Sequence, residues 1–397
     1  MYRLVYFLLL ISMPVLSQVK NDFVGYNKIT FELYEKQDWD KLIIRGKEAL
    51  QNEFDFFYLR VRLGIAYYEK GNFSKAINHL EKALLFNDSD PAVLEYLYFA
   101  YILSNRYQEA SRLYYKHIQI FKGKDLSIRP RVFDMLTLQG GIKVSDQYIE
   151  LGTQVDNISY GFFGASINLK GRFNLYQYAG ILSQGFTDKF IYQDFLYYYK
   201  YYFKQFEYYV SGNLLLGKGW SINPAYHLIR VDVISRRYND YYYGLSVIKN
   251  FNKVRLGINI SKSYMLDTDV IQLVPEISYY PLGNTKLYFT LRNTSNKSGD
   301  NDIENQVFGK MGLKIFSKTW LEGFYAYGKT QFLAYDNGYI LYNNPDYLIS
   351  RGGVTISQYF KNNMQIILSY QLENKEQLNS KDLYSHHFVM VGFNIKF

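Results

Sequence analysis

The sequence predicts α-helical repeats followed by an antiparallel transmembrane β-barrel of about 14 strands, with 12 or 16 strands as alternatives. The first observation is a 34-residue period that runs from about residue 23 to residue 124. The second is an alternation of apolar and polar residues that replaces this period from residue 131 to the last residue. The third is an aromatic content of 19%, with 43 Tyr, because rings with one apolar and one polar end are favoured at membrane interfaces.

The composition excludes several classes of site. The chain contains no Cys, which excludes a disulfide framework, a thiolate metal site, a cysteine nucleophile and a lipidated N-terminal cysteine. Its formal net charge of +9 raises the question of nucleic-acid binding. However, Lys and Arg form no run of five or six residues, and no nucleic-acid motif is present. We therefore expect no nucleic-acid partner.

Residues 1–17, MYRLVYFLLLISMPVLS, have the features of a secretory signal peptide. Arg3 supplies the positive start, an apolar run follows, and Val15 and Ser17 are small enough for the positions before a cleavage site. The apolar run of about 13 residues is shorter than the roughly 20 that a spanning helix needs, although an N-terminal anchor is the alternative. No other stretch approaches that length, so any membrane residence must come from strands.

The helical repeats are defined by aligning residues 57–90 with residues 91–124. In this alignment Tyr67 falls on Tyr101, and Ala76 falls on Ala110. Each unit is predicted to be a helix–turn–helix in which small residues let the helices approach and aromatic residues fill the groove between them. The residues expected to make this packing are Gly64, Tyr67, Ala76, Ala83, Tyr101 and Ala110.

The run LGIAYYEKGNFSKAINHLEKALLFNDSDP resembles a tetratricopeptide repeat (TPR), with Leu80 where an aromatic is usual. The second copy departs from the pattern by placing Tyr98 where Gly is usual, and residues 23–56 keep little more than the turn, as a cap would. The predicted helical domain comprises residues 18–126. Because repeat stacks normally bind a partner, the resemblance implies an unknown periplasmic protein. The alternative is that the repeats only pad the mouth of the barrel.

The predicted barrel covers residues 131–397. Segments such as 254–261, 365–372 and 389–397 place apolar residues on one face and polar residues on the other, which is the signature of an outer-membrane barrel. A soluble sandwich shows the same alternation. The segments are long and numerous, however, aromatic residues cluster at their ends, and the chain stops at Phe397. Outer-membrane barrels present such a terminal aromatic to their insertion machinery, which we therefore expect as a partner, together with outer-membrane lipid.

Turn lengths suggest how the strands are connected. Short turns are predicted at 169–172, 203–205, 251–253, 281–284, 316–318 and 360–363. Longer polar connections are predicted at 293–305, 333–347 and 373–383. Because outer-membrane barrels keep short turns in the periplasm, the long loops are expected to be extracellular. This pattern gives 14 strands, but three strand-like segments between 206 and 251 conflict with an even number.

The order of signal peptide, repeats and a barrel rich in Tyr and Gly resembles the YaiO family of outer-membrane β-barrel proteins. The stretches that carry this resemblance are TQVDNISYGFFGASINLKGRFNLYQYAG, YYYGLSVIKNFNKVRLGINISKSY and HHFVMVGFNIKF. The resemblance implies an outer-membrane location, and it supplies no catalytic residue to transfer.

The candidate reactive residues do not converge. His386 and His387 are expected on opposite faces of the last strand, and His227 lies on another strand. A Ser/His/acid site would need His386 beside Ser385 or Ser357 and a buried carboxylate, which nothing in the sequence specifies. No carboxylate cluster has metal-ligand spacing, and no Gly-rich phosphate loop precedes a helix. We therefore expect no enzymatic activity, no catalytic residue, no cofactor and no metal.

The interior of the predicted barrel is the more informative region. The alternation predicts that charged residues of both signs line the lumen, which is normal because inward polar groups need partners. The residues expected there are Lys200, Arg230, Arg255, Arg292, Lys310, Lys314, Arg351, Glu207, Asp232 and Glu322. A basic, Tyr-lined conduit would suit a hydroxyl-rich or acidic chain.

These features support a leading hypothesis and an alternative. The first is that the protein takes part in export or assembly of a surface polysaccharide, by analogy with exporters that join periplasmic repeats to a barrel. The alternative is an envelope scaffold that transports nothing and whose barrel anchors the repeats. An embedded envelope-modifying enzyme is a third, less favoured hypothesis.

Overall fold

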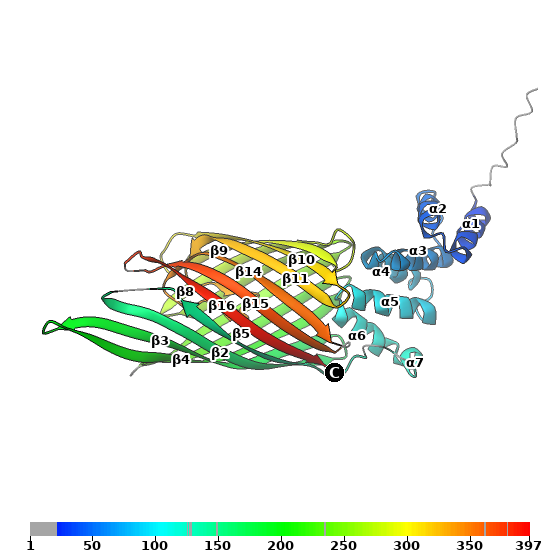
Figure 1. Cartoon of the computed structure of the whole chain (residues 1–397). Coiled ribbons are helices and arrows are strands. Elements are labelled where there is room, and N and C mark those ends of the chain that lie inside the picture. Colours follow the sequence, from blue (N-terminus) through cyan, green and yellow to red (C-terminus); the bar gives the residue numbers. More distant parts are fainter. Residues whose placement is uncertain are drawn as a thin grey trace, which may run out of the picture.

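The computed structural model describes residues 22–397 except 125, 127–128, 148–149, 234–235, 361–362 and 379. The predicted signal peptide, residues 1–17, lies outside the described residues. The chain forms a helical domain at one end of a β-barrel (Figure 1). The helices are α1 (Phe23–Glu35), α2 (Trp39–Gln51), α3 (Phe57–Glu69), α4 (Phe73–Ala83), α5 (Pro91–Leu103), α6 (Tyr107–Lys116) and α7 (Ile118–Phe121).

Local sequence explains where these helices begin. The side chains of Asp22, Asp38, Asn72 and Asp90 each accept a hydrogen bond from a backbone N–H in the first turn of a helix. Pro91 occupies the first position of α5, where a missing N–H costs nothing. Among the described helices, none combines the length and the apolar character that crossing a bilayer would need.

The helical domain is held by the small and aromatic residues of the repeat. A Cβ added at Gly64 would lie 2.6 Å from Cδ2 of Leu80, so α3 and α4 approach too closely for a larger residue at this position. The other packing residues named from the sequence are all buried, and they belong to one core with Leu80 and Leu97. These residues are Tyr67, Ala76, Ala83, Tyr101 and Ala110.

The barrel is closed and antiparallel, and its 14 strands confirm the predicted number. The first strand pairs with the last, and each other neighbour follows in chain order. The strands are β1 (Phe133–Ser145), β2 (Gly152–Leu169), β3 (Phe173–Tyr192), β4 (Phe195–Gly217), β5 (Trp220–Val233), β6 (Arg236–Phe251), β7 (Val254–Met265), β8 (Thr268–Tyr279), β9 (Leu287–Ser298), β10 (Glu304–Phe316), β11 (Thr319–Thr330), β14 (Tyr347–Phe360), β15 (Met364–Glu376) and β16 (Leu383–Lys396).

The outward face of the barrel is apolar around its circumference. On β16, Val389, Val391 and Phe393 point away from the lumen and are 55%, 38% and 43% exposed. On β7, Leu256 and Ile258 do the same. Polar and small residues alternate with them on the inward face, as the period-2 pattern predicts.

The structure corrects one predicted turn. Residues 203–205 lie within β4, a strand of 23 residues that ends at Gly217. The turn lies instead at Gly217 and Gly219, whose positive φ values of 103° and 78° suit glycine. The Lys-Gln pair after Phe203 resembled a turn, but both residues pair with β5 within the barrel wall, where Lys204 is exposed on the outer face and Gln205 is buried on the inner face. The segment after Phe206 is therefore the second half of β4, and the conflict in strand number disappears.

We call the barrel end beside the helices the near mouth and the opposite end the far mouth (Figure 1). The predicted long connections at the far mouth need two corrections. Most of 293–305 is strand, because β9 extends to Ser298 and β10 begins at Glu304. The segment 331–346, which we call the inner loop, folds back into the lumen instead of projecting outward. It contains a small hairpin of β12 (Ala334–Tyr335) and β13 (Ile340–Leu341).

Candidate functional site

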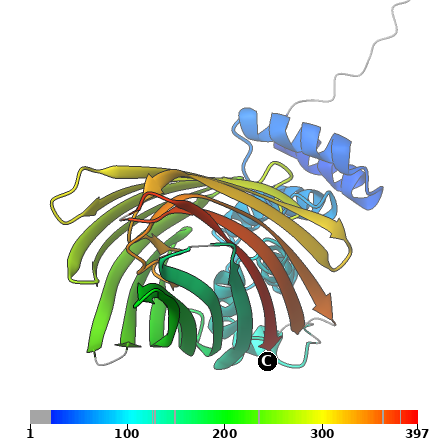
Figure 2. The same cartoon turned by 60° about the vertical axis from the view of Figure 1, so that its left-hand side comes forward.

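The helical domain docks directly on the turns of the near mouth. Nδ2 of Asn284 donates to the carbonyl of Gly71 at 2.8 Å, and the backbone N–H of Ser74 donates to the carbonyl of Gly283 at 3.0 Å. Further round the rim, Nε2 of Gln108 donates to the carbonyl of Asn213 at 2.8 Å. These bonds join the start of α4 to the β8–β9 turn and α6 to the last part of β4, on separate parts of the barrel. Figure 2 shows the helices of this end behind the ring of strands.

A glycine allows the closest of these contacts. Gly171, in the turn between β2 and β3, has a φ of 69°, and a Cβ there would collide with the backbone of Arg112 in α6. Beside it, Nδ2 of Asn168 donates to Oγ of Ser111 at 3.0 Å. The near mouth and α6 are therefore fitted to each other, since only glycine leaves room for the helix backbone.

Between the helices and the inner loop lies a cavity of about 1190 Å³, which we call the vestibule. Phe73 and Phe99 of the helical domain line one end, and Asp336 and Asn337 of the inner loop line the other. Six cationic and three acidic side chains contribute to its wall, so its net charge is positive. Tyr and Trp rings stand among them, including Trp320.

The vestibule cations differ in how they are neutralised. Arg292 is paired, because its Nη2 lies 2.8 Å from carboxylate oxygens of both Glu276 and Asp336. By contrast, Lys310 and Lys314 form no ion pair within the described part of the chain, and instead their ammonium groups lie over the rings of Tyr288 and Trp320 at 5.7 and 4.5 Å. Arg255 also has no acidic partner among the described residues. These three cations remain available to an incoming acidic or hydroxyl-rich group.

The inner loop crosses the lumen above the vestibule and is held on several sides. Nδ2 of Asn337 donates to the carbonyl of Asn223 on β5 at 3.0 Å, and its Oδ1 accepts from Asn259 on β7 at 2.7 Å. On another side, Oη of Tyr335 donates to Gln306 on β10 at 2.8 Å. The loop is thus bonded to three separate strands of the wall, and it closes the far half of the lumen.

His227 belongs to this packing and not to a reactive centre. It is fully buried, and its Nδ1 lies 2.7 Å from the carbonyl of Gly338 in the inner loop. Its Nε2 lies 3.4 Å from Glu207 and 3.3 Å from Oη of Tyr178. The ring of Tyr339 packs against Tyr178 at 5.3 Å. The arrangement anchors the tip of the inner loop to β3, β4 and β5.

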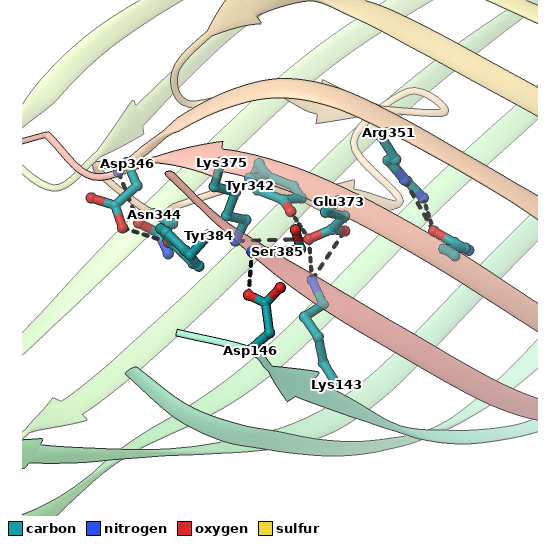
Figure 3. A network of polar contacts seen from close by, with 11 residues as sticks. Lys143, Asp146, Tyr342, Asn344, Asp346, Arg351, Glu373, Lys375, Tyr384 and Ser385 are labelled. Atoms are coloured by element: carbon teal, nitrogen blue, oxygen red, sulfur yellow. Dashed lines mark hydrogen bonds and ion pairs between the residues drawn. The ribbon is translucent and has the colours of Figure 1, made fainter. Parts of the chain in front are cut away.

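The second half of the inner loop is fastened by a buried charge network (Figure 3). Glu373 on β15 lies 2.9 Å from Nζ of Lys143 on β1 and 3.7 Å from Nζ of Lys375, and it accepts a hydrogen bond from Tyr342 of the loop. Glu373 and Lys375 are only 3% and 2% exposed. Because one carboxylate holds two strands and the loop together, this network is the main attachment of the loop on that side.

The residues predicted to line the lumen fall into three groups. Those that line the vestibule are Arg255, Arg292, Lys310, Lys314 and Glu322. Two others contact the inner loop or its anchors: Arg351 lies 4.8 Å above the ring of Tyr335, and Glu207 lies beside His227. The inward assignment is wrong for the third group, which is Lys200, Arg230 and Asp232.

Arg230 and Asp232 point away from the lumen because the far half of the barrel reverses the expected polarity, whereas Lys200 lies on the outer face of β4 beyond the end of β5. On β5, Ile229 and Val231 face inward and are fully buried, whereas Arg230 between them is exposed. Asp232 pairs with Arg237 on the outer surface. The inner loop makes the far lumen a packed core, so apolar residues can face inward there and charged residues face the solvent above the apolar band.

Sequence reasoning missed the inner loop itself. The segment contains Tyr335, Tyr339 and Tyr342 among several Asn residues, and its length suggested an external loop. Its composition was the available signal, because an exposed loop has little use for so many aromatic rings, whereas a loop buried in a polar lumen needs rings that also form hydrogen bonds.

The comparisons with known proteins identify one part of the chain. The tetratricopeptide repeat family model matches residues 58–90, so α3 and α4 form a TPR unit. No curated protein matches the chain. The resemblance to the YaiO family therefore stays a prediction.

Several solved structures align with parts of the chain at low scores. The toluene transporter TodX of Pseudomonas putida has 9% identity and a TM-score of 0.48, over 68% of this chain and 92% of TodX. A bacterial polysaccharide outer membrane secretin has 9% identity and a TM-score of 0.41, over 68% and 100%. MamA AMB-1 has 23% identity and a TM-score of 0.23, over 26% and 61%. At such scores these likenesses carry no information about what this chain does.

Proposed function

We propose that the protein is an outer-membrane component for export or assembly of a surface polysaccharide, and that the vestibule is where the polymer enters. The observation that carries this proposal is the vestibule, enclosed between the TPR domain and the inner loop, with unpaired cations beside aromatic rings. We propose that the near mouth and the TPR domain face the periplasm and that the far mouth faces the outside of the cell.

The outward face supports residence in a membrane. On β4, apolar side chains from Leu214 to Phe206 point outward and end at the exposed Lys204. On β7 the apolar positions end in the same way at Lys262. A band of this height matches the roughly 9–11 tilted residues with which a strand crosses a bilayer. We expect Phe397, at the near mouth, to be presented to the barrel insertion machinery.

The chemistry of the vestibule suits a sugar polymer. Arg255, Lys310 and Lys314 can bind carboxylates or hydroxyl groups, and the rings of Tyr288 and Trp320 can stack on the faces of sugar rings. None of this requires bond breaking, so we propose a non-enzymatic role. The TPR domain forms one wall of the vestibule and would guide the polymer or hold a periplasmic partner that modifies it.

The proposal is tested by removing the vestibule cations in cells. Replacing Arg255, Lys310 and Lys314 with Gln should lower the amount of surface polysaccharide severalfold at an unchanged level of folded protein. The matched control removes charge from the outer surface, through Lys200→Gln and Arg230→Gln, and should leave the polysaccharide at the wild-type level. Equal amounts in all three strains would refute the export proposal.

A specific observation favours a second function. The inner loop closes the far lumen with hydrogen bonds to β5, β7 and β10 and, on the opposite side from β5, to β15. If it never moves, the barrel is only an anchor, and the TPR domain organises an envelope complex at the near mouth. In that case the vestibule substitutions leave the surface polysaccharide intact, whereas substitutions on the free face of the TPR domain remove it.

A further inference from the structure

The hairpin of β3 and β4 extends well beyond the rest of the far mouth (Figure 1). β5 ends at Val233, which pairs with Phe203, so the eight residues 195–202 of β4 reach past β5 by about 25 Å along the strand. β2 begins at Gly152, opposite Lys189, so the tip of β3 also projects beyond its neighbour. The hairpin therefore projects past the exposed Lys204, at which the run of outward apolar residues on β4 ends.

One face of this hairpin is almost entirely aromatic. Because side chains alternate between faces, the register that pairs Phe190 with Tyr197 and Phe186 with Tyr201 places a set of rings on the same side. The rings of this face, which we call the platform, are Phe186, Phe190, Tyr192, Phe195, Tyr197, Tyr199 and Tyr201. Asp188, which pairs with Tyr199, is the one charged residue among these rings on the same face.

The rings lie nearly flat against their neighbours. Phe186 and Tyr201 stack with centroids 5.4 Å apart and an interplanar angle of 12°, and Phe190 and Tyr197 stack at 5.8 Å and 16°. The platform is nevertheless open, since Phe190, Tyr199 and Phe195 are 47%, 52% and 69% exposed. Exposed aromatic area of this size is unfavourable in water unless a ligand covers it.

The platform continues the wall of the lumen. Tyr197, Tyr199 and Tyr201 have the same parity along β4 as Glu207 and Tyr209, which face the interior. The opposite face of the hairpin carries Lys189 and Lys200 and continues the outer surface. A lipid would therefore meet the wrong face, whereas a polymer leaving the far mouth would meet the platform.

We propose that the platform is a binding site for a glycan strand, through the apolar faces of its sugar rings. This proposal deepens the proposed function and rests on it for the direction of travel. Four rings at alternate positions of β4 span about 20 Å, enough for several sugar units in a row. Tyrosine hydroxyls and Asp188 can bond to sugar hydroxyls, and the face carries no cation of the kind that a polyanion such as nucleic acid would need.

The test uses the full-length protein in lipid nanodiscs and the polysaccharide fraction extracted from the surface of the producing cells. Replacing Phe190, Tyr197 and Tyr199 with Ser should weaken binding at least tenfold. The matched control places Ser at Ile191, Leu196 and Tyr198 on the opposite face and should change binding less than twofold. Phe190→Tyr, which keeps a ring, should bind as the wild type does.

Two further comparisons distinguish glycan binding at the platform from binding elsewhere on the protein. Binding is also measured with Arg255, Lys310 and Lys314 changed to Gln, so that any contribution of the vestibule is removed and the platform effect should persist. Equal weakening by the two Ser triples would mean that binding does not depend on the platform face, and it would overturn the proposal. So would unchanged binding by the platform triple.

The two proposals can fail independently. If the platform triple binds normally while the vestibule variant loses surface polysaccharide in cells, the platform inference is wrong and export stands. If the platform triple loses binding while the vestibule variant keeps its surface polysaccharide, the export proposal fails and the platform is a surface glycan site.

Discussion

The two halves of the lumen differ although the same strands build both. In the near half, inward side chains such as Arg255 and Lys310 border an open vestibule. In the far half, inward side chains such as Ile229 and Tyr242 are fully buried against other protein atoms. The inner loop causes this difference, because it fills the far half with packed side chains and leaves the near half open to water. Strand alternation therefore tells which side chains share a face of a strand, but not which of the two faces points into the lumen.

The largest expected effect is a difference in stability between substituting a buried carboxylate in the far half and substituting one in the near half. Glu373→Gln leaves Lys143 and Lys375 without their partner in a site from which water is excluded, which should lower the free energy of unfolding by about 3–5 kcal/mol. The control, Glu322→Gln in the vestibule, keeps a hydrogen-bond acceptor for Tyr288 and should cost below about 1 kcal/mol. Urea unfolding followed by tryptophan fluorescence measures both, and equal losses would show that the halves do not differ.

The next effect concerns the two sides of one strand in the near half. Val391→Arg places a charge in the apolar band and should cost roughly 2–4 kcal/mol, as should Phe393→Arg. Asn394 lines the cavity at the near mouth, so Asn394→Arg should be tolerated. Unfolding from lipid vesicles in urea compares them. The same cost on both sides would mean that the inward and outward faces are assigned wrongly.

A third prediction concerns the TPR domain that covers the near half. Burial lowers the pKa of His79 to about 3, assisted by the charge of Arg60, whose Nη1 lies 3.2 Å from the ring. An unfolded histidine titrates near 6.5, so the unfolded chain binds the proton first. The stability of the domain should therefore fall as the pH is lowered from about 6.5 toward 3, by up to about 1.4 kcal/mol per pH unit.

This pH dependence can be assigned to His79 by substitution. Circular dichroism at about 222 nm follows the melting of the helices in the full-length protein. His79→Gln should melt with a flatter pH dependence over this window. Asp55, whose pKa the hydrogen bond from Arg60 lowers, contributes a loss in the same direction in both proteins. Identical pH dependence in the two proteins would rule out His79 as the source.

The smallest expected effect lies on the outer surface of the far half. Arg237 and Asp232 form an ion pair whose side chains are 62% and 49% exposed. Asp232→Asn should change the free energy of unfolding by less than about 1 kcal/mol, because exposed pairs are weak. A larger loss in urea unfolding would place Asp232 back in the lumen, where the alternation first assigned it.

The sequence was informative where a local pattern determines the structure. The repeat period located the TPR packing residues, the turn lengths gave the strand number, and the alternation gave the inward position of Arg255 and Lys310. The alternation gave the wrong face for Arg230 because β5 faces a packed core. No pattern within β5 reveals what lies on the other side of the lumen. The inner loop was misplaced for the same reason, since its partners, such as Gln306 and Glu373, come from distant strands.

The most direct test of the account is the conductance of the barrel with and without the inner loop. In planar bilayers the wild-type protein should be nearly silent, because the loop closes the far half. Replacing residues 332–344 with a short Gly-Ser linker should open steady, anion-preferring channels, and adding Arg255→Gln, Lys310→Gln and Lys314→Gln should remove that preference. A wild-type protein that already conducts as well as the loop-shortened variant would contradict the claim that the inner loop closes the lumen.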